Sequence, residues 1–152
     1  MSAGQNEKRN AAVYGPEEGE VLGPLRVLAQ SPDHPISVTE QTIPPGFPGP
    51  VRHRHARMHD IFYVLAGALT LHLDGQTTAL TPGSFAIVPP GVVHTFSNPG
   101  SEPVRFLTIY HPAGLEQYVK EVARRMGQGS QPSREEMAEI ASRYDFEPVP
   151  EG

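Results

Sequence analysis

The sequence predicts an all-β domain, a sandwich or barrel of short strands, followed by two C-terminal α-helices. Gly and Pro are frequent, at 15 and 17 of 152 residues, which suits a domain with many tight turns. Short runs of β-forming residues recur through the middle of the chain, with turn sequences such as Pro82-Gly83 and Pro90-Gly91 between them. Helical spacing of apolar residues begins only after residue 113. The length suits one domain with one core.

We expect three segments along the chain. Residues 1–20 are polar and rich in Gly and Glu, which predicts a flexible N-terminal segment. Residues 21–112 carry the strand patterns and form the predicted β-barrel. Residues 113–152 form a predicted C-terminal helical extension.

Eight strands are predicted, over residues 25–29, 36–43, 61–65, 69–73, 77–80, 84–88, 95–98 and 104–110. In the fourth of these, Leu69, Leu71 and Leu73 alternate with polar residues, as in a half-buried strand. Asp74-Gly75 follows at once and predicts a hairpin turn. The stretch 44–50 is too rich in Pro for a central strand and predicts a shaped loop.

Two helices are predicted after the strands. Apolar residues from Leu115 to Met126 recur at helical spacing, and Gly127 follows them. Ser133 and Glu136 have the spacing of a capping box, which predicts the start of a second helix. No residue in these helices suggests chemistry, and we expect them to cover the barrel or a partner subunit.

Charge and composition argue against several classes of partner. The net charge is −5, and the 12 Lys and Arg are spread along the chain, so no dense basic tract indicates a nucleic-acid surface. The longest apolar run, residues 61–69, is far shorter than the ~20 residues of a membrane helix. The first ten residues are polar and carry no secretory pattern, and the chain has no Cys. We therefore expect a cytoplasmic protein without a nucleic-acid or membrane partner.

Three histidines and one carboxylate are candidate metal ligands. His53 and His55 are two residues apart, so both side chains face one way if the segment is extended. Asp60 opens the next strand, and His94 enters from a distant one. Such a nitrogen and oxygen set suits a divalent transition metal such as Fe, Mn, Ni or Zn. The alternative is that His53 and His55 are surface histidines among arginines.

The spacing of these residues resembles the two motifs of the cupins. The first cupin motif has the form G-x5-H-x-H-x(3,4)-E-x6-G, and His53, His55, Asp60 and Gly67 follow it. The second has the form G-x5-P-x-G-x2-H-x3-N, and the chain matches it throughout with Gly83, Pro89, Gly91, His94 and Asn98. The resemblance covers residues 45–110 and implies a double-stranded β-helix (jelly-roll) barrel. It also implies one divalent metal ion held by His53, His55, Asp60 and His94.

The sequence departs from the cupin motif at two positions. Phe47 stands where the first motif opens with Gly, and Asp60 replaces Glu. Because Asp is one methylene shorter, Asp60 could bind the metal directly, act through water, or hydrogen-bond a ligand imidazole. His59 is the second candidate for that ligand position, although strand alternation would turn it away.

Three apolar residues are expected to line the substrate site. Phe62 and Val64 share strand parity with Asp60, and Phe96 shares it with His94. Plain core packing is an equally good interpretation. An apolar wall beside a metal would suit an aromatic or otherwise largely apolar ligand.

The resemblance implies a small-molecule enzyme, and we expect a dioxygenase similar to the quercetin-type enzymes. In it, Asp60 or His59 would move protons on an aromatic or enolisable substrate. The alternatives are a non-redox Zn-type cyclase or isomerase, similar to polyketide cyclases, and a non-catalytic small-molecule-binding protein. Free sheet edges and the appended helices predict a homodimer.

Overall fold

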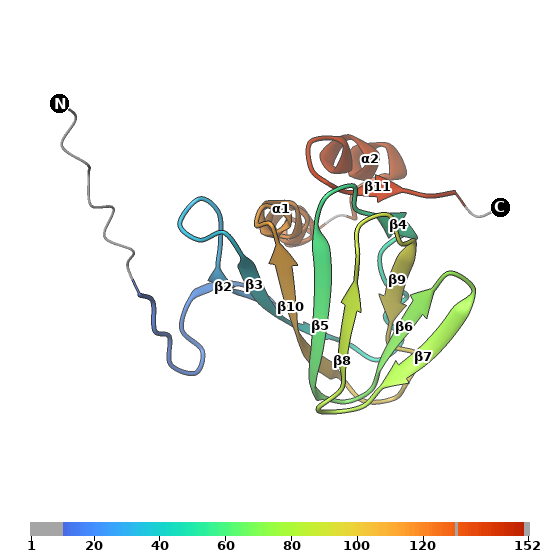
Figure 1. Cartoon of the computed structure of the whole chain (residues 1–152), viewed down its shortest axis with the longest axis horizontal. Helices are drawn as coiled ribbons and strands as arrows, with labels where there is room; N and C mark the ends of the chain where they lie inside the picture. The colour runs from blue at the N-terminus through green and yellow to red at the C-terminus, as the bar shows by residue number, and fades with distance from the viewer. Residues whose placement is uncertain (1–10, 130, 151–152) are drawn as a thin grey trace.

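Two antiparallel sheets face each other in the computed structural model, and two helices lie at one end of the sandwich (Figure 1). The structure describes residues 11–129 and 131–150. The predicted all-β fold with two C-terminal helices is confirmed. The sheets do not join into a closed hydrogen-bonded barrel, so the architecture is an open jelly-roll sandwich.

The larger sheet has six strands in the order β1-β2-β3-β10-β5-β8. Their bounds are β1 Glu20–Leu22, β2 Leu25–Ala29, β3 Ser37–Ile43, β5 His59–Ala66, β8 Phe85–Val88 and β10 Val104–His111. The smaller sheet has the order β11-β4-β9-β6-β7. Its strands are β4 His53–Arg54, β6 Leu69–Leu73, β7 Gln76–Leu80, β9 His94–Ser97 and β11 Glu147–Pro148.

The main core fills the space between the two sheets. Strand alternation directs the apolar residues of both sheets inward, and the buried cluster comprises Ile43, Phe62, Val64, Leu69, Leu71, Leu80, Val88, Val104 and Phe106. Each large apolar side chain buried in this way contributes about 1.5–3 kcal/mol. This core holds together the two sheets that supply the candidate metal ligands.

The predicted hairpin joins β6 and β7. Asp74 and Gly75 both have positive φ, at 34° and 81°, as a two-residue turn between right-twisted strands requires. Leu73 pairs with Gln76, which fixes the register of this hairpin.

A second apolar cluster attaches the helices to the end of the sandwich. Helix α1 covers Leu115–Met126, and α2 covers Arg134–Ser142 and begins with the predicted capping box of Ser133 and Glu136. The cluster comprises Met58, Tyr110, Leu115, Tyr118, Ile140, Ala141 and Phe146. Met58 and Tyr110 belong to the sandwich, so the helices lie over the end at which β5 begins and β10 ends (Figure 1).

The extension 113–152 is not only helical. After α2 the chain turns back, and β11 pairs with β4 through Glu147↔Arg54 and Pro148↔His53. A strand of two residues has no periodicity, which is why the sequence pattern gave no indication of it.

The N-terminal segment that we expected to be flexible lies only partly within the described residues. Residues 1–10 lie outside them. Further along, Arg26 of β2 donates hydrogen bonds to the main-chain oxygens of Gly15 and Glu18. Among the described helices, neither α1 nor α2 has the length and hydropathy of a membrane span.

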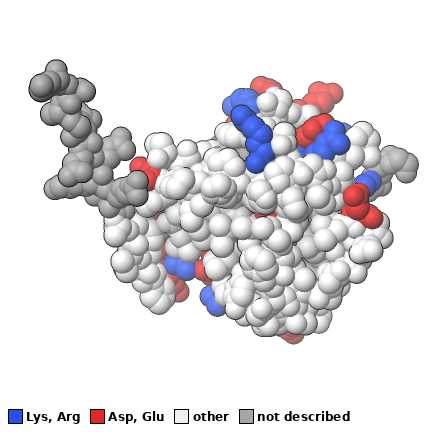
Figure 2. Space-filling model, in the orientation of Figure 1, with Lys and Arg blue, Asp and Glu red and all other residues white. Residues whose placement is uncertain are grey.

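Charged side chains gather around the helices and are sparse over β5 and β8 (Figure 2). The outer face of these two strands exposes Tyr63, Phe85 and Ile87. The homodimer stays a prediction.

The Pro-rich loop before β4 depends on one glycine, which generates a test. Gly49 has φ of 86°, and an added Cβ would lie 1.7 Å from the main-chain oxygen of Phe96 in β9. Gly49→Ala should therefore lower the free energy of unfolding by more than about 3 kcal/mol, because a left-handed backbone and a backbone clash add together. Chemical denaturation measures this loss.

Gly46→Ala is the matched control in the same loop. Gly46 also has positive φ, at 76°, but a Cβ there meets nothing within 4 Å, so only the conformational cost of about 1–2 kcal/mol is expected. Equal losses in the two variants would contradict the close approach of this loop to β9.

Candidate metal centre

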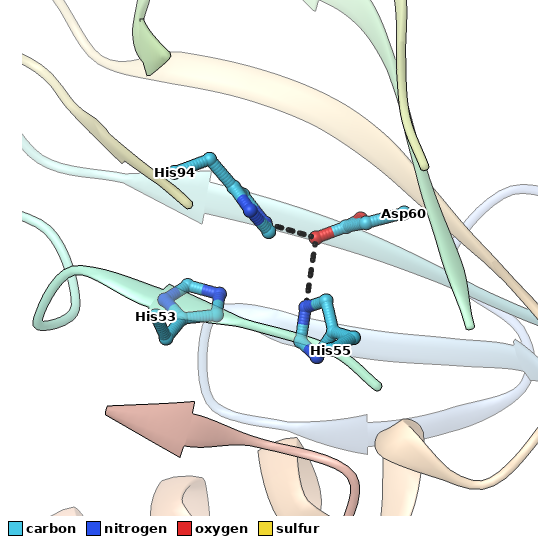
Figure 3. A group of neighbouring side chains, drawn as sticks. All are labelled: His53, His55, Asp60 and His94. Atoms are coloured by element: carbon cyan, nitrogen blue, oxygen red, sulfur yellow. Dashed lines mark hydrogen bonds and ion pairs between the residues drawn. The ribbon is translucent and has the colours of Figure 1, made fainter. Parts of the chain in front are cut away.

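Four ligand side chains meet in the interior from both sheets. His53 and His94 are paired across β4 and β9 of the smaller sheet, while Asp60 points inward from β5 of the larger sheet. His55 follows β4 in the loop that leads to β5. Figure 3 shows the three imidazoles around the Asp60 carboxylate. Each of the four residues is at most 4% exposed.

Main-chain carbonyls fix the tautomer of all three imidazoles. Each Nδ1 lies within hydrogen-bond distance of a carbonyl oxygen: His53 to Val51 at 2.7 Å, His94 to Val92 at 2.9 Å and His55 to Asp145 at 2.6 Å. A carbonyl only accepts, so each Nδ1 donates, and Nε2 is left as the ring atom that can take up a proton or a metal ion. Metal-binding histidines are held by hydrogen bonds of this kind.

The ligand atoms lie at distances suited to one shared ion. Asp60 Oδ2 is 3.2 Å from His94 Nε2 and 3.6 Å from His55 Nε2. One ligand atom from each of the four residues lies within 4.8 Å of the others. Two atoms about 2.1 Å from the same metal ion, at an angle of about 90–120°, are about 3.0–3.6 Å apart. The arrangement therefore fits a mononuclear site.

Two buried polar atoms of the group have no hydrogen-bond partner among the described residues. They are His55 Nε2 and Asp60 Oδ1. Leaving a buried acceptor unsatisfied costs about 1–3 kcal/mol. With Nδ1 already donating, a neutral Nε2 and a carboxylate are both acceptors, so either a proton or a cation must lie between them. A divalent cation satisfies both atoms.

The pKa values of the group follow from burial and from these contacts. Burial, together with the neighbouring His94, lowers the pKa of His53 to about 3, so this ring is neutral near pH 7. Burial also opposes a charge on His55, but the Asp60 carboxylate, whose Oδ2 lies 3.6 Å from Nε2, and the hydrogen bond to the main-chain oxygen of Asp145 outweigh it and raise the pKa. For Asp60, burial raises the pKa, but the neighbouring imidazoles of His55 and His94 outweigh burial, and the pKa is lowered. The carboxylate is thus ionised and available to a cation.

His59 lies apart from the group. In β5 its side chain has the opposite parity to Asp60, and the burial of the strand alternates accordingly. Among the described residues, the cluster of potential ligands comprises His53, His55, Asp60 and His94 without it. The structure therefore gives no support to His59 as a substitute ligand or as a proton carrier at this site.

The three expected lining residues are buried or partly buried near the site. The Phe62 ring is edge-on to His94, with centroids 6.4 Å apart, and Phe96 packs against Phe62 at 5.8 Å. Val64 is fully buried in the core cluster. Phe62, in the main core, and Phe96, packed against it, thus place an aromatic pair beside His94, and Val64 lies two residues further along β5.

Sequence reasoning missed two residues of the C-terminal extension. Asp145 accepts the hydrogen bond from His55 Nδ1, and Phe146 stacks on His53 with ring centroids 4.1 Å apart. They follow α2 by a few residues and have no motif or periodicity of their own. Only the packing of the helices brings them to the site.

An open groove of about 1010 Å³ lies elsewhere, between the N-terminal residues and the outer face of the larger sheet. Arg26, Glu40 and Arg105 line it, and Glu40 forms ion pairs with both arginines. None of the four candidate ligands borders it. The groove is therefore a separate surface feature and is not part of the candidate metal centre.

The geometry predicts that each histidine is needed for metal binding. His53→Ala, His55→Ala and His94→Ala should each weaken Co²⁺ binding by more than about 100-fold, since loss of a ligand exceeds the 10–100-fold effect of a supporting residue. Isothermal titration of chelator-treated protein measures this. His59→Ala should stay within about twofold of the parent protein; a loss as large as that of His94→Ala would contradict the assignment.

Metal affinity should rise with pH. Because the pKa of His55 is raised, the ion-free protein holds this proton to a higher pH than a free histidine, and metal must displace it. The apparent affinity should rise about tenfold per pH unit below that pKa and level off above it. His53, with a pKa of about 3, does not compete near neutral pH. Co²⁺ titrations across pH 6 to 8.5 test this, and an affinity that is flat between pH 6 and 7 would contradict it.

Comparison with known proteins identifies the fold. The family model described as "Cupin domain" matches residues 39–110, which include all four candidate ligands. No curated protein matches the chain.

Solved structures agree with this result. A Klebsiella pneumoniae protein with a double-stranded β-helix domain is 26% identical over 62% of this chain and 83% of its own, with a TM-score of 0.52. KdgF from Halomonas sp. is 19% identical over 61% and 81%, with a TM-score of 0.54. A predicted oxalate decarboxylase from Thermotoga maritima is 20% identical over 58% and 78%, at 0.53. The sandwich thus has the cupin double-stranded β-helix fold, and the part of the chain that resembles the cupin family model is residues 39–110.

Proposed function

We propose that this protein is a mononuclear metal-dependent enzyme of the dioxygenase type, acting on a small aromatic or enolisable substrate. One observation carries the proposal. Three buried imidazoles, each with Nδ1 donating to a main-chain carbonyl, surround one buried carboxylate, and one ligand atom from each of the four residues lies within 4.8 Å of the others.

The donor set favours an anionic substrate. Three neutral imidazoles and one carboxylate carry a single negative charge, so a divalent ion held by them keeps a net positive charge. A divalent ion held by His53, His55, Asp60 and His94 would supply a Lewis acid for an anionic substrate and a redox centre for chemistry with dioxygen. The buried residues around it exclude bulk water, which strengthens the attraction for an ionised hydroxyl or enol.

Asp60 has two roles open to it. Its Oδ2 faces His55 and His94, while Oδ1 is buried without a partner. With its pKa lowered, the carboxylate is ionised and can serve as fourth ligand. If a substrate displaces it, the same carboxylate can accept the substrate's hydroxyl proton.

The aromatic pair of Phe62 and Phe96 supports the proposed substrate class. Phe62 lies edge-on to His94, and Phe96 extends the apolar surface from the opposite sheet. Flat apolar surface beside a few polar groups is typical of sites for small organic molecules. The polar end of the substrate would face the ligands, and its apolar body would lie along the phenylalanines.

Metal content and dioxygen uptake test the proposal. Protein purified without added metal should hold about one Fe, Mn or Ni ion per chain, and one of these forms should consume O₂ with a flavonol or catechol. Asp60→Asn, which keeps the shape but removes the charge, should lower turnover by at least about 100-fold, the lower end of acid–base contributions. His72→Ala, outside the group, is the control.

Other results would decide against the oxygenase. A Zn-loaded protein with O₂-independent turnover would favour the cyclase or isomerase reaction. Ligand affinity that chelators leave unchanged, in a protein without metal, would favour a non-catalytic binding protein.

A further inference from the structure

We propose that the C-terminal clasp, which we define as Asp145–Val149, sets the metal affinity of the site, with Asp145 as a positioning residue for His55. This inference rests on the metal centre of the proposed function and adds how that centre is held in shape. The clasp contributes no ligand atom to the group. It acts through the segment that carries His53 and His55.

The Asp145 carboxylate binds the turn that links two ligands. Its Oδ1 accepts a hydrogen bond from the main-chain N–H of Ala56 at 2.6 Å. Its Oδ2 accepts from Arg57 at 3.0 Å and from Met58 at 3.1 Å. Residues 56–58 are the whole link between His55 and the start of β5. One carboxylate that binds all three of their N–H groups therefore fixes the path of the chain from His55 toward Asp60.

The main-chain carbonyl of the same residue orients the imidazole. It accepts from His55 Nδ1 at 2.6 Å. The other two histidines take their Nδ1 acceptors from residues two positions earlier, Val51 and Val92. His55 alone among the three uses an acceptor 90 residues away in sequence, so its tautomer and ring orientation depend on the docking of the C-terminal segment.

The remainder of the clasp holds its own position along β4. Strand β11 pairs with β4, and Val149 N–H donates to Arg52 O at 2.8 Å. The Phe146 ring stacks on His53 at 4.1 Å and on Tyr118 of α1 at 4.6 Å. Phe146 is only 6% exposed. The clasp therefore covers the histidines and ties them to the helical cluster.

These contacts give the clasp a definite physical role. Ligand imidazoles bind a metal well only when their orientation is fixed before the ion arrives, and loss of a supporting group typically costs 10–100-fold in affinity. Removing the Asp145 carboxylate frees the 56–58 turn and lets the Asp145 carbonyl move away from His55. The ion should then bind more weakly and leave faster.

The test is Asp145→Ala in the full chain, titrated with Co²⁺. We expect a 10–100-fold lower affinity, faster transfer of Co²⁺ to a chelator, and a changed Co²⁺ visible spectrum because the ligand field of His55 alters. Asp145→Asn keeps one acceptor oxygen and should fall between the parent protein and Asp145→Ala. If the alanine variant does not fold, the same measurements on Asp145→Asn test the proposal.

Glu147→Gln is the matched control within the clasp. It weakens the exposed ion pair of Glu147 with Arg54 but leaves the contacts of Asp145 in place, so Co²⁺ affinity should stay within about twofold. A purely structural role for Asp145 would lower the melting temperature of the ion-free protein and leave the affinity and the Co²⁺ spectrum of the folded variant unchanged.

The outcomes separate this inference from the proposed function. A parent protein that binds no Co²⁺ overturns both. A parent protein that binds Co²⁺, with equal affinity and spectrum in a folded Asp145→Ala or Asp145→Asn variant, overturns the role of the clasp alone.

Discussion

The hydrogen bond from each ligand imidazole to a main-chain carbonyl is the interaction on which this site depends. It places a proton on Nδ1, so that Nε2 without its own proton is a lone pair, and in His55 and His94 this atom lies 3.6 and 3.2 Å from Asp60 Oδ2. Those lone pairs and the carboxylate are all acceptors, and they are buried together. The interior of the sandwich is thus stable only if a proton or a cation joins them, and this requirement makes a metal centre the best account of the cluster.

The rest of the fold serves to keep these four groups in one place. The core between the sheets brings Asp60 of β5 toward His94 of β9, which lies in the other sheet. The close approach of Gly49 to β9 brings the Pro-rich loop, and with it His53, alongside His94. The helical cluster then places the C-terminal clasp against the loop that carries His55. Each ligand therefore depends on contacts between residues far apart in the chain.

Much of this could be predicted from local pattern. Leucine alternation and Asp74-Gly75 located the β6–β7 hairpin, the spacing of apolar residues located α1, and the capping box of Ser133 and Glu136 located the start of α2. The spacing of His53, His55 and His94 pointed to the group that the structure brings together. Strand parity also indicated that His59 would turn away from Asp60, as it does.

The sequence could not predict contacts between segments that are far apart in the chain. Strand β11 has only two residues, which is too short for a pattern of alternation. Neither Asp145 nor Phe146 has sequence neighbours that indicate a site. Their role arises because α1 and α2 pack on Met58 and Tyr110 and so return the chain to β4. Open sheets in place of a closed barrel likewise follow from which edges pair, and alternation within one strand does not determine that.

X-ray absorption spectroscopy of the Co²⁺-loaded protein tests the central claim most directly. The account predicts one Co²⁺ per chain with three imidazole nitrogens at about 2.0–2.2 Å, completed by oxygen ligands. A spectrum with one imidazole or none, or a spectrum unchanged by His94→Ala, would show that the ion binds elsewhere and would contradict the metal centre described here.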